Sequence, residues 1–316
     1  MKVISFAKIK SLAIDPLTCY EWVSDAIAHK SEAILPTKTS LKPGIEGVFY
    51  NTMPVLLPTA SLGMGGVKEV TRYPKRVPSL DSQILLYDLQ TGKDLALLDG
   101  NWITAMRTGA VASHSIKLFA VEDFSVLGFI GLGNTARAEL LVLLSLYPDR
   151  QLTVKLKSYK DQHELFAERF ESYTNVTFQY CASYEEVVRD SDVIVSAVTV
   201  FNTDICSDDC FKEGVLVVPI HTRGFTNCDL FFDKVFADDA NHVKEFRYFD
   251  KFKSFSEVAD VVNSKNPGRE SNKERIIAYN IGIALHDIYF ASKIYEMCGK
   301  DCPEITLNPP TDKFWV

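Results

Sequence analysis

The sequence predicts an α/β fold that combines a doubly wound parallel sheet with an α+β domain. Three observations lead to this prediction. A strand, a glycine-rich turn and a helical pattern follow one another over residues 124–147. After them, short apolar strands alternate with helical patterns. Before them, hairpin-like strands occupy much of the first third of the chain.

The bulk composition fits a globular protein. The chain has 316 residues, of which 47% are hydrophobic and 24% charged, and its formal net charge is −7. That length suits two domains, or one inserted into the other. An acidic chain without a dense basic run is not expected to bind nucleic acid or an anionic membrane. The segment MKVISFAKIKSLAID lacks the apolar core of a signal peptide, and no run reaches transmembrane length, so we expect a cytoplasmic protein.

The seven cysteines do not form a metal-binding pattern. Cys206 with Cys210, and Cys298 with Cys302, are spaced closely enough to suggest metal pairs. No further histidine or cysteine follows at the spacing of a zinc site. We therefore expect no metal site and reduced thiols.

The first third of the chain is predicted to be α+β. A helix is expected over residues 16–34, where apolar side chains recur at helical spacing and Pro16 stands near the start. A second helix, over 102–120, contains many small residues, which indicates close packing or a nearby ligand. Proline- and glycine-rich turns separate the expected strands, which are 48–50, 62–70 and 84–87.

The rest of the chain alternates between strands and helices, as a parallel sheet with crossover helices requires. Ser183 and Glu186 form a capping box that predicts a short helix, and Ser271 with Glu274 form another. The second box is expected to begin a long final helix over 272–298 that returns to the first domain. The other predicted elements are strands 126–130, 152–156, 176–180, 193–198, 215–220 and 235–237, and a helix over 161–173.

The stretch Gly131-Leu132-Gly133-Asn134-Thr135-Ala136 follows an apolar strand and precedes a helix. In a dinucleotide-binding unit, Gly131 would allow the tight turn and Gly133 would let a pyrophosphate approach the backbone. Ala136 would let the helix pack closely on the strand, and the helix N-terminus would favour the negative charge. The alternative is an ordinary strand–turn–helix whose glycines serve geometry only.

The next strand bears on the choice of cofactor. An acidic residue about 20 positions after the glycines would hold the ribose 2′-hydroxyl of NAD. The stretch 155–160 instead contains three lysines and no acid. Lys157 and Ser158 could hold a 2′-phosphate, so the sequence favours NADP slightly over NAD. The alternative is that these lysines belong to a solvated loop.

Three cations could together bind a carboxylate. Lys68 lies beside glycines in a strand, Arg107 lies in the helix of small residues, and Lys38 lies between two prolines. The plainer interpretations are a solvated edge residue for Lys68 and an ion pair within the chain for Arg107. His221 ends a strand at the edge where such sheets bind ligands, as an acid–base or a surface residue. His114 is interpreted as a core histidine.

Several stretches together resemble the ornithine cyclodeaminase/μ-crystallin family. They are PTKT (36–39), GGVKEVTRYP (65–74), ILLYDLQTGKDLALLDGNWITAMRTGAVAS (84–113), GLGNTA (131–136) and GRESNKERIIAYNIGIALHD (268–287). The resemblance covers nearly the whole chain and is most specific from LLDG through RTGA. It implies a homodimer that uses NAD or NADP. The implied domains are an NAD(P)-binding Rossmann domain at 119–269 and a substrate-binding and dimerisation domain at 1–118 plus 270–316.

The resemblance also implies roles for single residues. Lys68 matches the family's active-site lysine, which holds the substrate carboxylate near the reacting carbon, and Arg107 matches its carboxylate-binding arginine. Lys38 stands where the family usually has an arginine, so a point charge replaces a bidentate fork. His221 stands near the aspartate that handles the substrate amino group in cyclodeaminases.

The pyrophosphate loop of the family corresponds to Gly131, Gly133 and Ala136, with Asn134 between them and Thr135 where glutamine is common. The resulting hypothesis is an NAD(P)-dependent oxidoreductase of a small amino or imino acid, of the amino acid dehydrogenase or ketimine reductase type. Lys68 or His221 would move the proton. One alternative is a lyase that uses bound NAD to make proline and ammonia from ornithine, against which the missing aspartate argues. The other is a non-catalytic, μ-crystallin-like binder of a small molecule.

Overall fold

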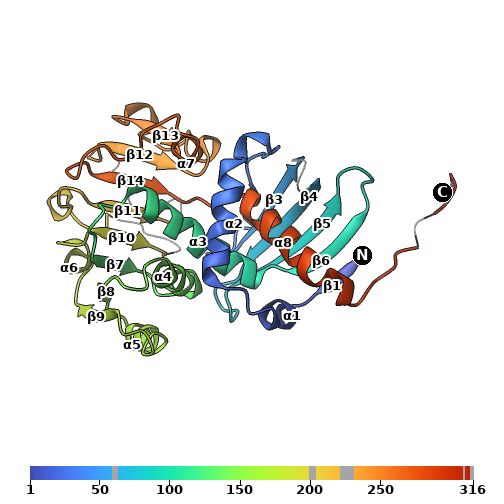
Figure 1. The fold of residues 1–316 in the computed structure, drawn as a ribbon, viewed down its shortest axis with the longest axis horizontal. Helices are drawn as coiled ribbons and strands as arrows, with labels where there is room; N and C mark the ends of the chain where they lie inside the picture. Colours follow the sequence, from blue (N-terminus) through green and yellow to red (C-terminus); the bar gives the residue numbers. More distant parts are fainter. Residues whose placement is uncertain (59–62, 199–203, 221–230, 309, 314–316) are drawn as a thin grey trace. The chain divides into compact units, whose positions relative to one another are not determined.

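The computed structural model describes the chain except for residues 59–62, 199–203, 221–230, 309 and 314–316 (Figure 1). The chain divides into two compact units, which are treated separately below. The first unit consists of Met1–Ala13, Glu32–Ile103 and Asp287–Val316, and the second of Ile14–Ser31 and Thr104–His286.

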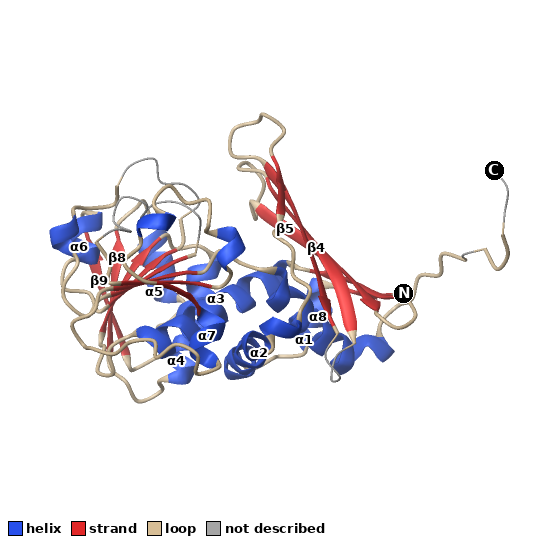
Figure 2. Ribbon diagram, turned by 90° about the horizontal axis from the view of Figure 1, so that it is seen from above, coloured by secondary structure: helices blue, strands red, loops and turns tan. Residues whose placement is uncertain are grey.

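The first unit is built on a six-stranded sheet in the order β1-β6-β5-β4-β3-β2. β1 pairs with β6 in parallel, and the remaining pairs are antiparallel. The helix α8 lies along one face of this sheet (Figure 2). The strands are β1 (Lys2–Ile4), β2 (Thr39–Leu41), β3 (Phe49–Leu57), β4 (Met64–Arg72), β5 (Leu80–Asp88) and β6 (Asp94–Asp99), and the helices are α1 (Phe6–Ser11) and most of α8 (Ala284–Cys298). The predicted strands 48–50, 62–70 and 84–87 fall on β3, β4 and β5, of which β3 and β5 are longer than predicted, and residue 62 lies outside the described residues. The sequence did not predict β1, β2 or β6.

Alternation along the strands determines which side chains face the core. In β3, Met53, Val55 and Leu57 are buried while their neighbours are not, as expected for a sheet with one covered face. The same period-2 pattern in β4 buries Lys68 together with Val70. The plainer interpretation of Lys68 as a solvated edge residue is therefore wrong, because the lysine lies on the covered face of the sheet.

The second unit is built on an eight-stranded parallel sheet in the order β13-β12-β14-β11-β10-β7-β8-β9. The chain runs outward from β7 in both directions, which makes the carboxyl end of β7 a topological switch point. The strands are β7 (Val126–Ile130), β8 (Leu152–Lys157), β9 (Val176–Cys181), β10 (Val193–Ser196), β11 (Leu216–Pro219), β12 (Lys234–Ala237), β13 (Phe255–Glu257) and β14 (Ile276–Tyr279). The α-helices are α2 (Pro16–Ala28), most of α3 (Asn101–Phe119), α4 (Asn134–Leu146), α5 (Gln162–Glu168), α6 (Tyr184–Val188) and α7 (Val258–Val262). The predicted fold class is confirmed.

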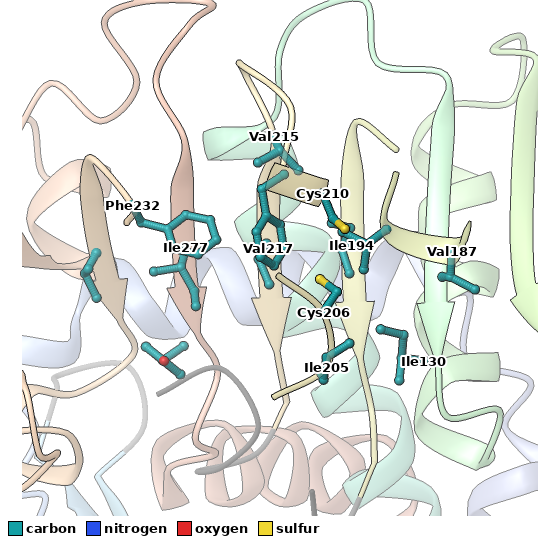
Figure 3. Close-up of a cluster of buried hydrophobic side chains, with 14 of the residues drawn as sticks. Ile130, Val187, Ile194, Ile205, Cys206, Cys210, Val215, Val217, Phe232 and Ile277 are labelled. Carbon is teal, nitrogen blue, oxygen red and sulfur yellow. The ribbon is translucent and has the colours of Figure 1, made fainter. Parts of the chain in front are cut away.

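The parallel sheet has a continuous apolar core. Ile130, Ile194, Val217 and Ile277 come from four adjacent strands and point into the cluster shown in Figure 3. Every residue of β10 and β11 is buried, because crossover segments cover both faces of a parallel sheet. Cys206 and Cys210 belong to this cluster, so both cysteines are apolar core residues of the parallel-sheet unit. Within the described chain no cluster of His, Cys, Asp or Glu has the composition of a metal site.

The long helix predicted over 272–298 is wrong in its first part. Residues Ile276–Tyr279 form β14, which pairs with β11 and β12 in the parallel sheet, and α8 begins only at Ala284. All four residues of β14 are buried, and pairing on both sides outweighs their helical spacing. The helix predicted over 16–34 ends at Ala28, and that predicted over 161–173 is shorter, Gln162–Glu168.

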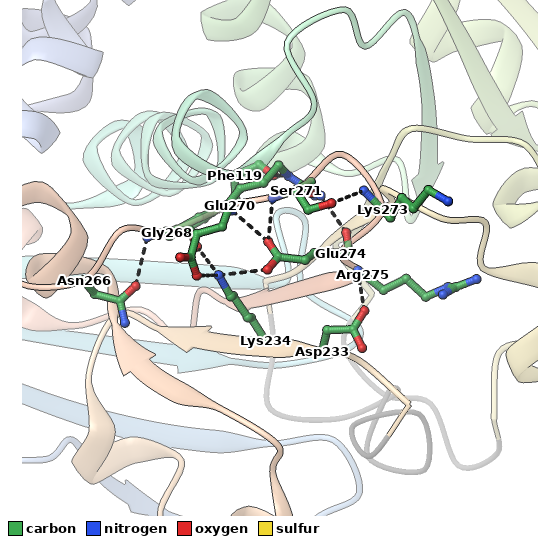
Figure 4. A network of polar contacts seen from close by, with 11 residues as sticks. Phe119, Asp233, Lys234, Asn266, Gly268, Glu270, Ser271, Lys273, Glu274 and Arg275 are labelled. Atoms are coloured by element: carbon green, nitrogen blue, oxygen red, sulfur yellow. Dashed lines mark hydrogen bonds and ion pairs between the residues drawn. The ribbon is translucent and has the colours of Figure 1, made fainter.

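The supposed second capping box instead closes a turn. One carboxyl oxygen of Glu274 accepts hydrogen bonds from the N–H groups of Glu270 and Ser271, and the other pairs with Lys234 Nζ at 3.0 Å. Figure 4 shows this network, in which Lys234 also contacts Glu270. The network ties the segment before β14 to the start of β12. The capping box at Ser183 is confirmed, since its hydroxyl accepts from the N–H of Glu186 at the start of α6.

Among the described helices, none combines the length and the apolar character needed to cross a membrane.

Candidate functional site

The glycine loop lies at the switch point of the parallel sheet, directly after β7. Gly131 has a φ of +88°, and a Cβ atom there would lie 2.8 Å from the backbone carbon and oxygen of Ala197. Only glycine suits this position, because the left-handed conformation and the close backbone both exclude a side chain. The tight turn therefore depends on Gly131.

Gly133 has a different role. It precedes α4 in extended conformation, and a Cβ atom there would meet no atom of the described residues within 4 Å. Packing among the described residues therefore does not require glycine at this position. The space beside the free N–H groups at the start of α4, which begins with Asn134 and Thr135, fits the pyrophosphate of a dinucleotide.

The helix α4 packs closely against α3. Ala136 is fully buried, and a Cβ atom at Gly109 of α3 would lie 2.5 Å from the backbone nitrogen of Glu139. The hydroxyl of Ser113 donates to the carbonyl oxygen of Glu139 at 3.2 Å. The small residues of α3 are thus explained by close packing of two helices, one of the two interpretations that the sequence allowed.

Glu139 is a buried acid that the sequence did not single out. Its side chain is fully buried, and neither carboxyl oxygen has a hydrogen-bond partner within the described chain. Burial raises the pKa of Glu139 well above its usual range. The sequence could have indicated Glu139, because it is an ionisable residue between Ala138 and Leu140 on the apolar side of α4.

Lys157 and Ser158 lie at the carboxyl end of β8, next to β7. The Nζ of Lys157 donates to the carbonyl oxygen of Ser158 at 3.0 Å and lies 5.8 Å from the ring centre of Tyr184. The N–H of Ser158 donates to the carbonyl oxygen of Cys181. Both side chains are half-buried.

In the first unit, Lys68 forms a buried ion pair with a residue that the sequence did not indicate. Its Nζ lies 2.9 Å from Oδ1 of Asp287, with 1% of the lysine side chain and 0% of the aspartate exposed. Asp287 belongs to the final helix, 219 residues further along the chain. The sequence could have indicated Asp287, because it is an acidic residue within the apolar pattern of the final helix. Lys38, in the same unit, is half-buried in the loop before β2.

In the second unit, Arg107 is buried on α3 beside Gly282. Gly282 has a φ of +84°, and a Cβ atom there would lie 3.0 Å from Nη1 of Arg107. The N–H of Gly282 donates to Oδ2 of Asp238 at 2.7 Å, which holds this turn in place. Gly282 and Asp238 thus shape the surroundings of the guanidinium, and the sequence did not point to either. His221 lies outside the described residues.

A small pocket opens within the second unit. It holds about 210 Å³ of empty space, part of it solvent, and its polar lining includes His114, Asp238, Asn280 and His286. Burial lowers the pKa of His114 to about 4, so the imidazole is neutral at physiological pH. Its burial confirms the interpretation of His114 as a core histidine.

Comparisons with known proteins give matches over most of the chain. Residues 22–301 match the family model described as the Ornithine cyclodeaminase/mu-crystallin family. A Delta(1)-pyrroline-2-carboxylate reductase of Bacillus cereus is 25% identical over 285 residues, which cover 83% of this chain and 86% of that protein.

Two solved structures share the fold. The Delta(1)-pyrroline-2-carboxylate reductase of Thermococcus litoralis, in complex with NADH and L-proline, has a TM-score of 0.83 at 24% identity, covering 94% of this chain and 97% of that one. An archaeal alanine dehydrogenase dimer with bound NAD has a TM-score of 0.83 at 23% identity, covering 97% and 99%. At these identities the likeness shows the fold, and the bound molecules are those of the two relatives.

Proposed function

Because this chain belongs to the ornithine cyclodeaminase/mu-crystallin family, we propose that it is a nicotinamide-dependent oxidoreductase acting on a small amino or imino acid. The unit with the parallel sheet would bind the cofactor, and the unit with the antiparallel sheet would bind substrate and dimerise. The observation that carries the proposal is the contrast within the glycine loop. The turn requires Gly131, whereas the space beside Gly133 is not filled by any atom of the described chain.

The backbone of Gly133, Asn134 and Thr135 would hold the pyrophosphate at the start of α4, and Ala136 would keep that helix close to β7. A bound nicotinamide supplies a hydride donor or acceptor, chemistry that no side chain provides. What supports these roles is the fit of the loop to an anion, with a free helix N-terminus and an unfilled Cβ position.

Three cations are proposed to bind the substrate carboxylate: Lys68, Arg107 and Lys38. Lys68 and Arg107 are buried, and a hydrogen bond between a cation and a carboxylate is stronger in a buried site than in water. Arg107 can offer a bidentate fork, whereas lysine offers a point charge. Proton transfer is proposed for Lys68, or for His221 through a water molecule.

The sequence-based preference for NADP over NAD stays a prediction. In its favour, the carboxyl end of β8 presents Lys157 and Ser158 and no acid. Against it, Lys157 Nζ is already bonded to the carbonyl oxygen of Ser158, so a 2′-phosphate would have to displace that contact.

A homodimer is also proposed. Apolar side chains that a monomer would leave in water occur on the antiparallel sheet, including Leu41 of β2, Tyr50 of β3 and Leu80 of β5. The relative with alanine dehydrogenase activity is described as a dimer. Light scattering should therefore give twice the 35.5 kDa of one chain.

The deciding experiment is a fluorescence titration of the pure protein with NADH and with NADPH. It is followed by an absorbance screen of cyclic imines such as Δ1-pyrroline-2-carboxylate, and of 2-oxo acids with ammonia. Saturable cofactor binding with oxidation by an imino acid supports the proposal. Binding without turnover of any of these compounds would favour a non-catalytic binder. Ammonia release from ornithine, without net NADH, would favour the lyase. Failure to bind either cofactor would refute the proposed function.

A further inference from the structure

Gly66, two residues before Lys68, lets a helix lie directly on the strand that carries the lysine. A Cβ atom at Gly66 would lie 2.5 Å from the carbonyl oxygen of Leu85 and 2.7 Å from Cδ1 of Ile288. Since Ile288 belongs to α8, this helix rests directly on the backbone of β4. Gly66 and Lys68 share one face of the strand. The residue before Ile288 therefore comes within reach of the lysine.

That residue is Asp287, and its contact with Lys68 is short and buried. The Nζ of Lys68 donates to Oδ1 of Asp287 at 2.9 Å, and both side chains are almost completely buried. Across the sheet, Lys68 is flanked by Met53 of β3 and Ile84 of β5, which carry no charge. From α8, the carboxyl group of Asp287 faces Lys68.

A buried ammonium is costly without a counter-ion, and a carboxylate at hydrogen-bond distance stabilises the charged form. The ammonium has three N–H donors in tetrahedral arrangement. A bond from one of them to a rigid partner restricts the directions of the other two. The position of Asp287 is fixed relative to Lys68, because the next residue, Ile288, packs directly against Gly66 on the same strand as the lysine.

We infer that Asp287 is a positioning residue, which orients the Nζ of Lys68 and keeps it as an ammonium able to bind a substrate carboxylate. Asp287 acts through Lys68, so this role rests on the proposed function, in which Lys68 contacts the substrate. Gly66 of the GGVK stretch then has a purpose beyond strand geometry, since it admits the helix that carries the aspartate.

The test compares four variants with the wild type: Asp287→Asn, Asp287→Glu, Lys68→Met and, as a matched control, Ser292→Ala. Ser292 is buried on the same helix, where its hydroxyl donates to the carbonyl oxygen of Tyr289 at 2.7 Å. Reduction of Δ1-pyrroline-2-carboxylate by NADH is followed between about pH 6 and pH 10, which brackets the loss of a lysine proton. Binding of L-proline in the presence of NADH is measured by calorimetry, and folding by thermal unfolding.

For Asp287→Asn, we expect the KM for the imine and the Kd for L-proline to rise about 10- to 100-fold, with NADH binding unchanged. Activity should also be lost at a lower pH than in the wild type, because the ammonium has lost its counter-charge. Asp287→Glu keeps the charge but displaces Nζ. Asp287→Glu should lose activity at the same alkaline pH as the wild type, but its KM for the imine should still be higher than that of the wild type. Ser292→Ala should behave as the wild type.

Wild-type KM and pH profile in Asp287→Asn, together with loss of activity in Lys68→Met, would overturn the role of Asp287 and leave the proposed function intact. If Asp287→Asn does not fold, Asp287→Glu decides, and a wild-type KM in that variant contradicts positioning. Wild-type activity in Lys68→Met would instead contradict the substrate-binding role of Lys68. Absence of turnover in the wild type, with this imine and with every other compound of the screen, would count against the proposed function.

Discussion

Glu139 predicts an unusual dependence of stability on pH. Its carboxyl group is fully buried without a hydrogen-bond partner in the described chain, and burial raises its pKa well above the ordinary 4.5. In the unfolded chain the group ionises near that ordinary value. Below it, both states carry the proton and the contribution to stability is complete. As the pH rises towards the folded pKa, only the unfolded state releases its proton, so stability falls.

The size of the effect follows from linkage. Over the interval between the two pKa values, one proton is held by the folded state and not by the unfolded state. The free energy of unfolding then falls by about 1.4 kcal/mol for each pH unit. Glu139→Gln replaces the neutral acid by a neutral amide of the same shape, so it removes this slope. The variant should gain stability over the wild type as the pH rises.

The assay is urea unfolding of both proteins at several pH values above 4.5, followed by circular dichroism. Glu171→Gln, at an exposed glutamate of the same unit, is the matched control and should follow the wild type at every pH. A difference between Glu139→Gln and the wild type that does not change with pH would refute the reasoning. It would mean that the folded protein holds Glu139 as an ion with a partner.

Further predictions follow from the glycines and the thiols. Gly133→Ala should leave thermal stability unchanged but weaken NADH binding about 10- to 100-fold, as measured by fluorescence, because its methyl group enters the space at the helix N-terminus. Gly131→Ala should instead destabilise the protein by about 1–2 kcal/mol or more, since its φ of +88° and Ala197 both oppose a side chain. Equal effects of the two substitutions would contradict the separate roles given to these glycines. Gly282→Ala should weaken L-proline binding more than NADH binding, because its methyl group would crowd Arg107; calorimetry with each ligand decides. Burial raises the pKa of Cys19 and Cys206 to about 12 and that of Cys298 to about 11, so these thiols should react slowly with a disulfide reagent at pH 8 until urea is added, and fast labelling of the native protein at these positions would show that they are accessible.

Local sequence patterns were sufficient for most elements of the fold. Proline- and glycine-rich turns marked out strands of the antiparallel sheet, and the apolar run before Gly131 predicted β7, because turn residues and buried strands leave local patterns in the sequence. The glycine loop could be recognised because its geometry depends on residues adjacent in the chain. The role of Gly131 in the turn is visible in its positive φ.

What tertiary structure alone decided involves residues far apart in sequence. Ile276–Tyr279 has the spacing of a helix and becomes a strand because β11 and β12 offer backbone partners on both sides. Lys68 could be interpreted as a solvated residue until the antiparallel sheet buried it and α8 brought Asp287 to it from 219 positions away. Local propensity amounts to less than about 1 kcal/mol per residue, whereas pairing, burial and charge compensation between distant segments amount to several. The sequence by itself therefore determined the fold class and the glycine loop, and tertiary packing decided the surroundings of the buried charges.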